Sequence, residues 1–368
     1  MTMAPVPRIH QFSLTMSAGD GVSNGVIFTR KLLRQLGFES EIYSLHTYDK
    51  LETPVRPVAE LSGDDCDLLL VHHSMGHDYA QKINRLACAK VLVYHNITPH
   101  HYFPPQSHNY IYAQKGREQL AAWPGLYRGA IGMSKLNSAE LDACGYRDIA
   151  TLPLLVDLDL LGGEERAPNW LNGNNPFLLS VGRLVDNKRQ HLLIEALWHL
   201  KKQGQLAEPP LLVLVGGTTN DHYRAALEYR INELGLNSQV LLPGKCPDPE
   251  LRWLYQHAAA FWCASEHEGF CMPLVEAAYF QLPVVAVAAS NIPDTLGESG
   301  LLIEQANPMH LAAATATVLN DSAVRAALVA GAKRNLQRFH PQTLLRQLAG
   351  YLQQLGFASP SPPEHRVD

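Results

Sequence analysis

FLLSVGRLVDNKRQHLLIEALWHLKK, residues 177–202, combines an apolar run, a polar loop and a longer segment with apolar residues three and four positions apart. The run at 177–181 predicts a buried strand, and the periodicity of 190–202 predicts an amphipathic helix. This strand, loop and helix pattern recurs along the chain, which is typical of parallel sheets covered by helices on both faces. The sequence therefore predicts an α/β fold.

The first half repeats the pattern. A helix is expected at 24–36, ended by Gly37, after the first strand and a loop rich in Gly and Ser. Strands are expected at 9–14, 41–44, 67–72, 90–94, 129–133 and 149–152, with helical segments between them. This half reads as one doubly wound unit.

The pattern breaks at LGGEERAPNWLNGNN, residues 161–175, and restarts at Phe177. We interpret this stretch as a linker between a domain at 1–160 and a domain at 176–338. Beyond the first strand and helix of the second domain, strands are expected at 211–215, 240–242, 260–263, 284–287 and 301–303, and helices at 223–234, 249–258 and 273–281. Further helices are expected to about residue 355, and residues 357–368 are expected to be a disordered tail.

Composition excludes several classes of protein. The chain has 368 residues, of which 46% are hydrophobic and 18% charged, enough apolar material for two ordinary cores. The formal net charge is −5 and neither half is basic, so binding to nucleic acid through a general positive charge is disfavoured.

Cysteine use and the chain start suggest a cytoplasmic location. The six cysteines contain no Cys-x-x-Cys pair, and the start MTMAPVPRIHQFS lacks a basic segment followed by an apolar core. Reduced, buried thiols fit best. Because no apolar run reaches the roughly 18 to 20 residues of a membrane span, we expect any membrane contact to be peripheral.

Open parallel sheets bind ligands at the carboxyl ends of their strands, so a cleft between the two domains is the expected site. In SEHEGFCMPLVEAA, residues 265–278, Glu268 lies in the loop after a strand and Glu276 in the first turns of the next helix. The amides of Gly269, Phe270 and Cys271 would face an anion at that helix N-terminus, and the carboxylates would accept hydrogen bonds from sugar hydroxyls. The alternative is a helix-start charge and a solvated helix residue.

A second loop supplies cations. After the strand at 177–181 come Gly182, which allows close approach, then Arg183 and Lys188, which could hold a diphosphate without a metal. As an alternative, both are solubilising surface charges. Gly216 and Gly217 end the strand at 211–215 and give another loop able to approach a ligand closely.

The first half offers a third set of candidates. In KVLVYHN, His95 and Asn96 lie at a strand's carboxyl end, where a histidine could bind a sugar hydroxyl. The alternative is a structural histidine held by backbone groups. Gly19 and Asp20, after the first strand, lie where the backbone could approach a phosphate or an acceptor.

Metal binding is not expected. Asp65 and Asp67 have the Asp-x-Asp spacing of some sugar transferases, as do Asp157 and Asp159, but neither pair falls at a suitable strand end. His72, His73 and His77 lack a Glu in an HExxH pattern, and we expect them to line a polar cleft at a strand end.

With Arg183, Lys188, Glu268 and Glu276 in this order, the sequence resembles the retaining GT-B glycosyltransferases of family 4 over most of residues 8–355. SVGRL with NK resembles the family's phosphate-binding stretch, EGFCMPLVEA its two-glutamate motif, and VYHNITP the segment whose histidine faces the transferred sugar. The resemblance implies two Rossmann-like domains facing across a cleft. It also implies that the last helix, at 339–356, packs back on the first domain.

By this resemblance, Arg183 and Lys188 would bind the donor diphosphate, Glu268 the hydroxyls of the sugar, Glu276 the ribose, and His95 would face the transferred sugar. Further donor-binding candidates are Gly19, Asp20, Gly182, Gly216, Gly244, Lys245, Gly269, Phe270 and Cys271. The last of these stands where the family commonly has Gly, and Asp20 departs from the family's glycine pair.

The implied activity is metal-independent transfer of a hexose, such as mannose, from a nucleotide-diphosphate donor to a hydroxyl of a saccharide or lipid-linked saccharide. The acceptor hydroxyl would attack the face that the diphosphate leaves, and no cofactor is needed. We expect a role in bacterial surface polysaccharide synthesis, in the cytoplasm or peripherally at the inner face of its membrane.

Two other classes of protein remain. An NAD(P)-dependent oxidoreductase is suggested by Gly19-x-Gly21 after a strand, but the next glycine falls at 25 where the motif requires 24. A non-catalytic two-domain sugar-binding protein would usually be exported and carry a leader segment.

Overall fold

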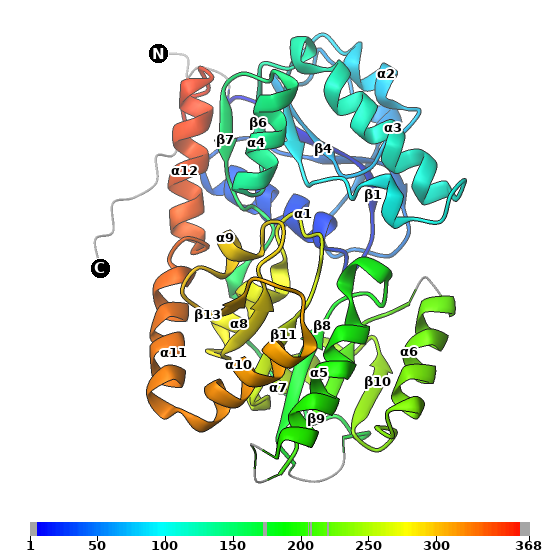
Figure 1. Ribbon diagram of the computed structural model, residues 1–368. Coiled ribbons are helices and arrows are strands. Elements are labelled where there is room, and N and C mark those ends of the chain that lie inside the picture. Colours follow the sequence, from blue (N-terminus) through cyan, green and yellow to red (C-terminus); the bar gives the residue numbers. More distant parts are fainter. Residues whose placement is uncertain (1–5, 172–174, 205, 207, 219–220, 361–368) are drawn as a thin grey trace. The chain divides into compact units, whose positions relative to one another are not determined.

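The computed structural model describes residues 6–171, 175–204, 206, 208–218 and 221–360, which form two compact units (Figure 1). The first unit comprises the described residues up to Asp157 together with those from Phe339 on, and the second comprises those from Leu158 to Arg338. Each unit contains one parallel sheet. The prediction of two doubly wound α/β units is confirmed.

The first sheet has the strand order β3-β2-β1-β4-β5-β6-β7. Its strands are β1 (Ile9–Met16), β2 (Ile42–Thr47), β3 (Arg56–Pro57), β4 (Leu68–His73), β5 (Ala89–Tyr94), β6 (Gly129–Gly132) and β7 (Ile149–Thr151). The helices of this unit are α1 (Gly21–Gln35), α2 (Ala80–Asn84), α3 (His108–Ala122), α4 (Lys135–Cys144) and α12 (Pro341–Gln354), with short 3-10 turns at 58–60, 100–102 and 124–126.

The second sheet has the strand order β10-β9-β8-β11-β12-β13. Its strands are β8 (Phe177–Val181), β9 (Leu211–Val215), β10 (Val240–Gly244), β11 (Ala260–Cys263), β12 (Val284–Val287) and β13 (Gly300–Ile303). The helices are α5 (Gln190–Gln203), α6 (Asp221–Glu233), α7 (Asp248–His257), α8 (Met272–Tyr279), α9 (Ile292–Leu296), α10 (Pro308–Asn320) and α11 (Ser322–Leu336), with 3-10 turns η4 (Leu158–Leu160) and η5 (Asp186–Lys188).

Alternation along the strands of the second sheet builds two cores. Leu178 and Leu212 point into one core with α5, α6 and α10, whereas Phe177, Leu179 and Val213 point into the other with α7 and α8. Because successive strand residues face opposite sides, an almost continuous apolar run serves both cores. This explains why these strands could be located from the sequence.

The last helix belongs to the first unit. The Tyr351 hydroxyl on α12, red in Figure 1, donates to the backbone oxygens of Ala130 and Asp148, the latter at 2.8 Å. The described part of the expected disordered tail also packs there, because Ser359 Oγ donates to the backbone oxygen of Leu36 at 2.7 Å. Residues 361–368 of that expected tail lie outside the described residues.

The expected linker packs on the second unit where it is described. Arg166 N donates to the backbone oxygen of Pro249 at 3.0 Å, and Trp170 and Leu171 pack against the apolar cluster beside α7. Apolar side chains within the Gly- and Asn-rich stretch therefore anchor it. Residues 172–174 of the expected linker lie outside the described residues.

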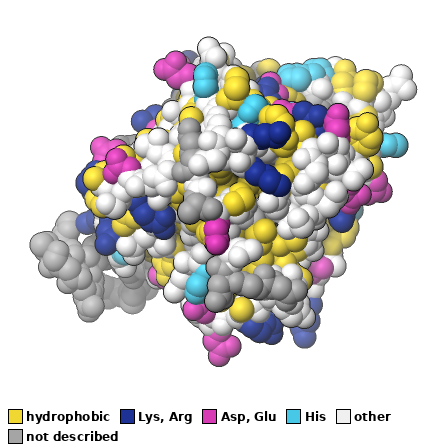
Figure 2. All heavy atoms as spheres, turned by 60° about the horizontal axis from the view of Figure 1, so that its bottom comes forward, with side chains coloured by type: hydrophobic (Ala, Val, Ile, Leu, Met, Phe, Trp, Pro, Cys, Tyr) yellow, Lys and Arg dark blue, Asp and Glu magenta, His cyan; other side chains and the backbone are white. Residues whose placement is uncertain are grey.

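The molecular surface carries mixed side chains. On the face drawn in Figure 2, Lys and Arg side chains lie among acidic, apolar and uncharged ones. None of the described helices combines the length and the apolar character needed to cross a bilayer.

Candidate functional site

Three predicted glycines meet at the carboxyl edge of the second sheet. Gly182, Gly216 and Gly244 follow or end the adjacent strands β8, β9 and β10, and Gly216 N donates to the backbone oxygen of Gly244 at 2.8 Å. A Cβ on Gly216 would lie 2.0 Å from the backbone oxygen of Gly182. No side chain fits at Gly216, so the loops form a bare backbone surface. The stem of Lys245 passes beside Gly217, whose Cβ would lie 3.1 Å from it.

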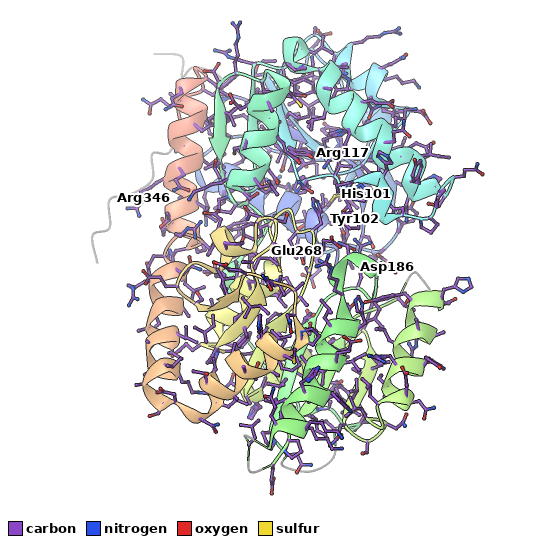
Figure 3. All side chains as sticks on the ribbon, in the orientation of Figure 1. His101, Tyr102, Arg117, Asp186, Glu268 and Arg346 are labelled. Carbon is purple, nitrogen blue, oxygen red and sulfur yellow. The ribbon has the colours of Figure 1, made fainter. Side chains whose placement is uncertain are left out.

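Lys188 and Glu268 form an ion pair at the same edge of the sheet. Lys188 lies in η5 after β8, and Glu268 lies in the loop between β11 and α8, where Figure 3 labels it. Lys188 Nζ donates to Glu268 Oε1 at 2.5 Å, and their side chains are 21% and 10% exposed. The structure therefore joins the predicted diphosphate-binding cation to the predicted sugar-binding carboxylate.

Further contacts tie these two loops together. Glu266 N donates to the backbone oxygen of Asn187 at 2.8 Å, and Arg189 pairs with the Glu266 carboxylate at 2.5 Å. Arg189 holds a left-handed conformation with φ of 51°, which is costly for a residue with a side chain. The loop contacts hold this conformation in place and fix Lys188 between them.

The ion pair keeps both groups charged despite their burial. Burial by itself raises the pKa of Glu268, but the charge of Lys188 and hydrogen bonds from Lys188, Ser265 and Cys271 outweigh it, so that the pKa is lowered. Burial lowers the pKa of Lys188, but the charge of Glu268 outweighs burial, so that this pKa is raised. The carboxyl edge of the second sheet thus carries the positive charge of Lys188 and the negative charge of Glu268.

The N-terminus of α8 lies beside this pair. Cys271 precedes the helix with φ of 72°, and within the described chain no side chain caps it. The loop is held by the Thr295 hydroxyl, which donates to the backbone oxygen of Phe270 at 2.5 Å. An uncapped helix start concentrates N–H groups and a partial positive charge, which suits an anion.

Glu276 lies one turn into α8 and is engaged by Tyr255. The Tyr255 hydroxyl donates to Glu276 Oε2 at 2.5 Å. Burial raises the pKa of Glu276, and the hydrogen bond from Tyr255 offsets part of that rise. Glu276 is partly buried, and its described hydrogen bond comes from a neutral hydroxyl and not from a cation. Such a carboxylate is suited to accept hydrogen bonds from ligand hydroxyls.

A small hollow joins part of the predicted set. Its volume is about 10 Å³, and it is lined by Gly182, Lys188, Glu268 and Cys271, together with Ser265 and Gln190. Arg183, Gly216, Gly244 and Glu276 do not line it.

Arg183 lies outside the hollow and is exposed. Its backbone oxygen accepts from Gln190 Nε2 at 2.9 Å, and its guanidinium makes no ion pair with the described residues. The cation is therefore held on an anchored loop while its side chain stays available to a ligand.

In the first unit, His95 and Asp20 have defined partners. His95 lies directly after β5, and its Nε2 is 2.8 Å from His72 Nδ1. The Asp20 carboxylate caps α1 by accepting from Ser23 N at 2.9 Å, which explains why this helix begins at Gly21 and not at residue 24. Gly19 has φ of 70°, a conformation that favours glycine.

The expectation that His72, His73 and His77 line a polar cleft is wrong. All three are at least 96% buried, and His73 Nε2 bonds the backbone oxygen of Gly116 at 3.0 Å. The ring centroids of His73 and Trp123 lie 4.9 Å apart, and His72 bonds Gln11 and His95. Asp65 and Asp157 pair with Arg8 and Lys31, respectively.

Comparison with known proteins finds a family match in the second unit. The family described as "Glycosyl transferases group 1" matches residues 163–335. Residues 163–335 therefore resemble the glycosyl transferases of group 1, and we call this stretch the group 1 domain. This group 1 domain contains the ion pair, the uncapped helix and the three glycines.

A curated relative and two solved structures illustrate the likeness. The Campylobacter jejuni N-acetylgalactosamine-N,N'-diacetylbacillosaminyl-diphospho-undecaprenol 4-alpha-N-acetylgalactosaminyltransferase is 31% identical over 201 residues, 54% of this chain and 51% of that protein. Anabaena HepE, solved with UDP and glucose, matches with a TM-score of 0.72 at 19% identity, covering 95% of this chain and all of that chain. WaaG, a glycosyltransferase involved in lipopolysaccharide biosynthesis, matches with a TM-score of 0.67 at 14% identity, covering 93% of this chain and 100% of that chain.

The solved structures show the fold, which is GT-B with two Rossmann-like domains. The chain spans about half the length of the curated relatives it matches.

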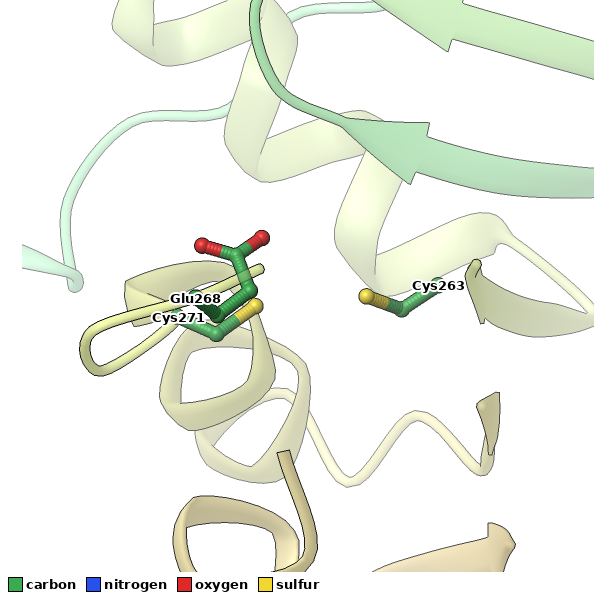
Figure 4. Close-up of side chains that lie close together, drawn as sticks. All are labelled: Cys263, Glu268 and Cys271. Carbon is green, nitrogen blue, oxygen red and sulfur yellow. The ribbon is translucent and has the colours of Figure 1, made fainter. Parts of the chain in front are cut away.

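The group 1 domain also gathers three potential metal ligands that the sequence does not suggest. Cys263, Glu268 and Cys271 place their ligand atoms within 4.8 Å of one another (Figure 4). Thiols and a carboxylate are donors that zinc accepts. However, the ammonium of Lys188 already neutralises Glu268, and it would repel a cation at this carboxylate.

Ser265 and Gln190 are among the lining residues of the hollow that were missed from the sequence. Ser265 follows β11 by two positions, and Gln190 opens α5 with only 4% of its surface exposed. The position of Ser265 after a strand is a signal that could have found it. Gln190 reads as an ordinary first helix residue, and the chain gives no local sign of its burial.

Proposed function

We propose that this protein is a glycosyltransferase that moves a hexose, such as mannose, from a nucleoside-diphosphate donor to a hydroxyl of a saccharide or lipid-linked saccharide. The observation that carries the proposal is the Lys188–Glu268 pair beside the uncapped start of α8. Lys188 and the helix N-terminus would bind a diphosphate, and the carboxylate of Glu268 would accept hydrogen bonds from sugar hydroxyls. All three lie at the carboxyl edge of the second sheet.

Donor binding would exchange partners within this pair. The diphosphate oxygens would take Lys188, and Glu268 would turn its oxygens to the hydroxyls of the sugar. Arg183 would add a second cation, and Glu276 would accept from the ribose. The bare backbone at Gly182 and Gly216 would let the phosphates approach closely.

The charges then suit bond cleavage. Breaking the bond between the anomeric carbon and the phosphate oxygen leaves positive charge on the sugar and negative charge on the diphosphate. Lys188, Arg183 and the α8 N-terminus would stabilise the leaving group without a metal. The acceptor hydroxyl would attack from the face that the diphosphate leaves and pass its proton to the departing phosphate oxygen. Configuration is then retained.

The relatives suggest where this reaction belongs. The name of the Campylobacter relative includes diphospho-undecaprenol, and WaaG is involved in lipopolysaccharide biosynthesis. By analogy, we infer a role in bacterial surface polysaccharide synthesis, in the cytoplasm and at the inner face of its membrane, where a lipid-linked acceptor would be found.

A thermal-shift panel tests the proposal. UDP, GDP, ADP and their monophosphates are added to the full chain, with UDP first because the HepE structure holds UDP. A diphosphate at about 100 times its Kd stabilises the folded state by about 2.7 kcal/mol, which raises Tm by roughly 5–11 °C. The monophosphates should act weakly because they lack the second phosphate.

Radiolabelled sugar transfer from the matching donor completes the test. Binding of a nicotinamide cofactor without any response to nucleoside diphosphates would indicate an oxidoreductase. Binding of free sugar alone would indicate a sugar-binding protein. Either result would refute the proposal.

A further inference from the structure

Two cysteines lie close together where the loop after β11 meets α8. Cys263 is the last residue of β11, and Cys271 is the residue that precedes α8. Both thiols are free, and their sulfur atoms lie within 4.8 Å of one another. Figure 4 shows the two sulfur atoms pointing toward each other. The bond of a disulfide is about 2 Å long, so the two side chains have only a short distance to close.

The loop between the two cysteines is held by side chains from outside it. The Ser290 hydroxyl donates to the backbone oxygen of Glu268 at 2.9 Å, and the Thr295 hydroxyl donates to that of Phe270 at 2.5 Å. These bonds fix the backbone of the loop shortly before Cys271. The two sulfur atoms therefore stay close while the protein is folded.

A small oxidant can reach both thiols. Cys263 and Cys271 line the hollow that also contains Lys188 and Glu268, and they keep 6% and 7% of their surface exposed. The volume of the hollow, about 10 Å³, is roughly what one water molecule requires. Hydrogen peroxide, one of the smallest oxidants, therefore fits better than a bulky disulfide. Cys271 also has φ of 72°, and backbone strain of this kind gathers at functional positions.

We propose that Cys263 and Cys271 form a modification site, at which hydrogen peroxide oxidises the two thiols to a reversible disulfide. Each thiol loses its hydrogen atom, and one bond forms between the two sulfur atoms. The O–O bond of the peroxide breaks, and its two oxygen atoms leave as two molecules of water. The sulfur atoms together give up two electrons, and the peroxide takes up the same two. A dithiol reverses the modification by thiol–disulfide exchange.

The disulfide would change the candidate site at Glu268. The Cys271 thiol is one of the hydrogen-bond donors to this carboxylate, together with Lys188 and Ser265. A disulfide has no S–H group, so Glu268 would lose this donor. The cross-link would also restrict the loop that carries Glu268. Donor binding requires Glu268 to turn from Lys188 to the sugar hydroxyls, so the disulfide should weaken donor binding, an effect that rests on the proposed function.

Peptide mapping of the full chain tests the disulfide directly. The protein is treated with hydrogen peroxide, unfolded with a thiol-blocking reagent, and digested without reduction by a protease that cleaves after glutamate. Cleavage after Glu266 and Glu268 separates the two cysteines, so their fragments stay joined only through a disulfide. We expect the joined fragments, and we expect dithiothreitol to separate them. Recovery of both cysteines as blocked thiols, as sulfinic acids or in disulfides with other cysteines would overturn the inference.

Thermal shifts with UDP or GDP connect the disulfide to the candidate site. In the wild-type protein, peroxide should reduce the shift in Tm that the diphosphate causes, and dithiothreitol should restore it. Cys263→Ser removes one sulfur atom of the pair, so peroxide should no longer cause a loss that dithiothreitol reverses. Cys246→Ser is the matched control, because it removes a cysteine of the same unit outside the pair, and it should behave like wild type.

The outcomes separate the two proposals. If the cross-link forms but the diphosphate shift stays as in the reduced protein, the effect on donor binding is refuted. If the cross-link forms and no nucleoside diphosphate shifts Tm in either state, the modification site stands and the proposed function fails. If the reduced protein shows the shift but no cross-link forms, the modification site is refuted and the proposed function stands.

Discussion

Replacing Lys188 with Met isolates the energetics of the candidate site, because it removes a charge while keeping much of the side-chain volume. The Lys188–Glu268 pair is 2.5 Å long and mostly buried, and the substitution leaves Glu268 without its cation. Breaking a buried pair by removing one partner costs about 3–5 kcal/mol. At about 2–4 °C per kcal/mol for a unit of this size, Tm should fall by roughly 6–20 °C.

Thermal unfolding can be followed by tryptophan fluorescence. This assay reports on the second unit, because four of the five tryptophans lie there (Trp170, Trp198, Trp253 and Trp262). The double variant Lys188→Met/Glu268→Gln is the matched control. It removes both charges, so it should regain most of the lost Tm. A Tm within about 2 °C of wild type for the single variant would refute the reasoning.

The pH dependence of this pair follows from the direction of each pKa shift. The lowered pKa of Glu268 gives stability that is present above its unfolded value and is lost as pH falls through the folded pKa. The raised pKa of Lys188 gives stability that is present below its unfolded value and is lost as pH rises through the folded pKa. The Tm difference between wild type and the double variant should therefore be largest between about pH 5 and pH 10.

Other substitutions test single features. Glu276→Gln should leave the ligand-free Tm unchanged or slightly raised, because burial raises the pKa of this carboxylate, but it should weaken diphosphate-dependent thermal shifts. A raised carboxyl pKa costs stability as pH rises, so any gain should vanish in acid; a large loss at neutral pH would contradict this. Gly216→Ala should abolish the UDP or GDP shift, since its Cβ would collide with the Gly182 oxygen; an unchanged shift would contradict the close approach. Arg183→Ala should lower kcat/KM by about 30- to 1000-fold with little change in Tm; a rate within twofold of wild type would exclude it from the mechanism. Asp20→Ala should lower the unfolding free energy by about 1 kcal/mol in denaturant, because α1 loses its N-cap; an unchanged unfolding free energy would contradict the capping role.

Much of the fold could be predicted because its signal is local. The apolar runs of β8, β9, β11 and β12 end at the expected residues, since a strand buried on both faces is apolar at almost every position. Two short elements gave no such signal. Strand β3 is two residues long and exposed, and α9 spans five residues between β12 and β13.

The loops of the candidate site were predicted one by one from the sequence. The contacts between these loops could not be predicted. Loop chemistry after each strand marked Gly182, Lys188, Glu268 and Gly216 from residue type and position. Nothing local says that Lys188 binds Glu268, because the two are 80 residues apart and meet only when β8 and β11 pair. The histidines at the end of β4 were misjudged because residue type does not reveal which side chains the core encloses.

The sequence by itself determined two α/β units and the loops that follow their strands, since hydrophobic periodicity and glycine placement act over a few residues. Only the tertiary structure decided which of those loops touch. It paired Lys188 with Glu268, brought Gly216 against Gly182, and aligned Gln11, His72 and His95 across three strands. These contacts depend on the order of the strands in each sheet and on packing between segments that are far apart in the sequence. Patterns of a few neighbouring residues do not determine either of these.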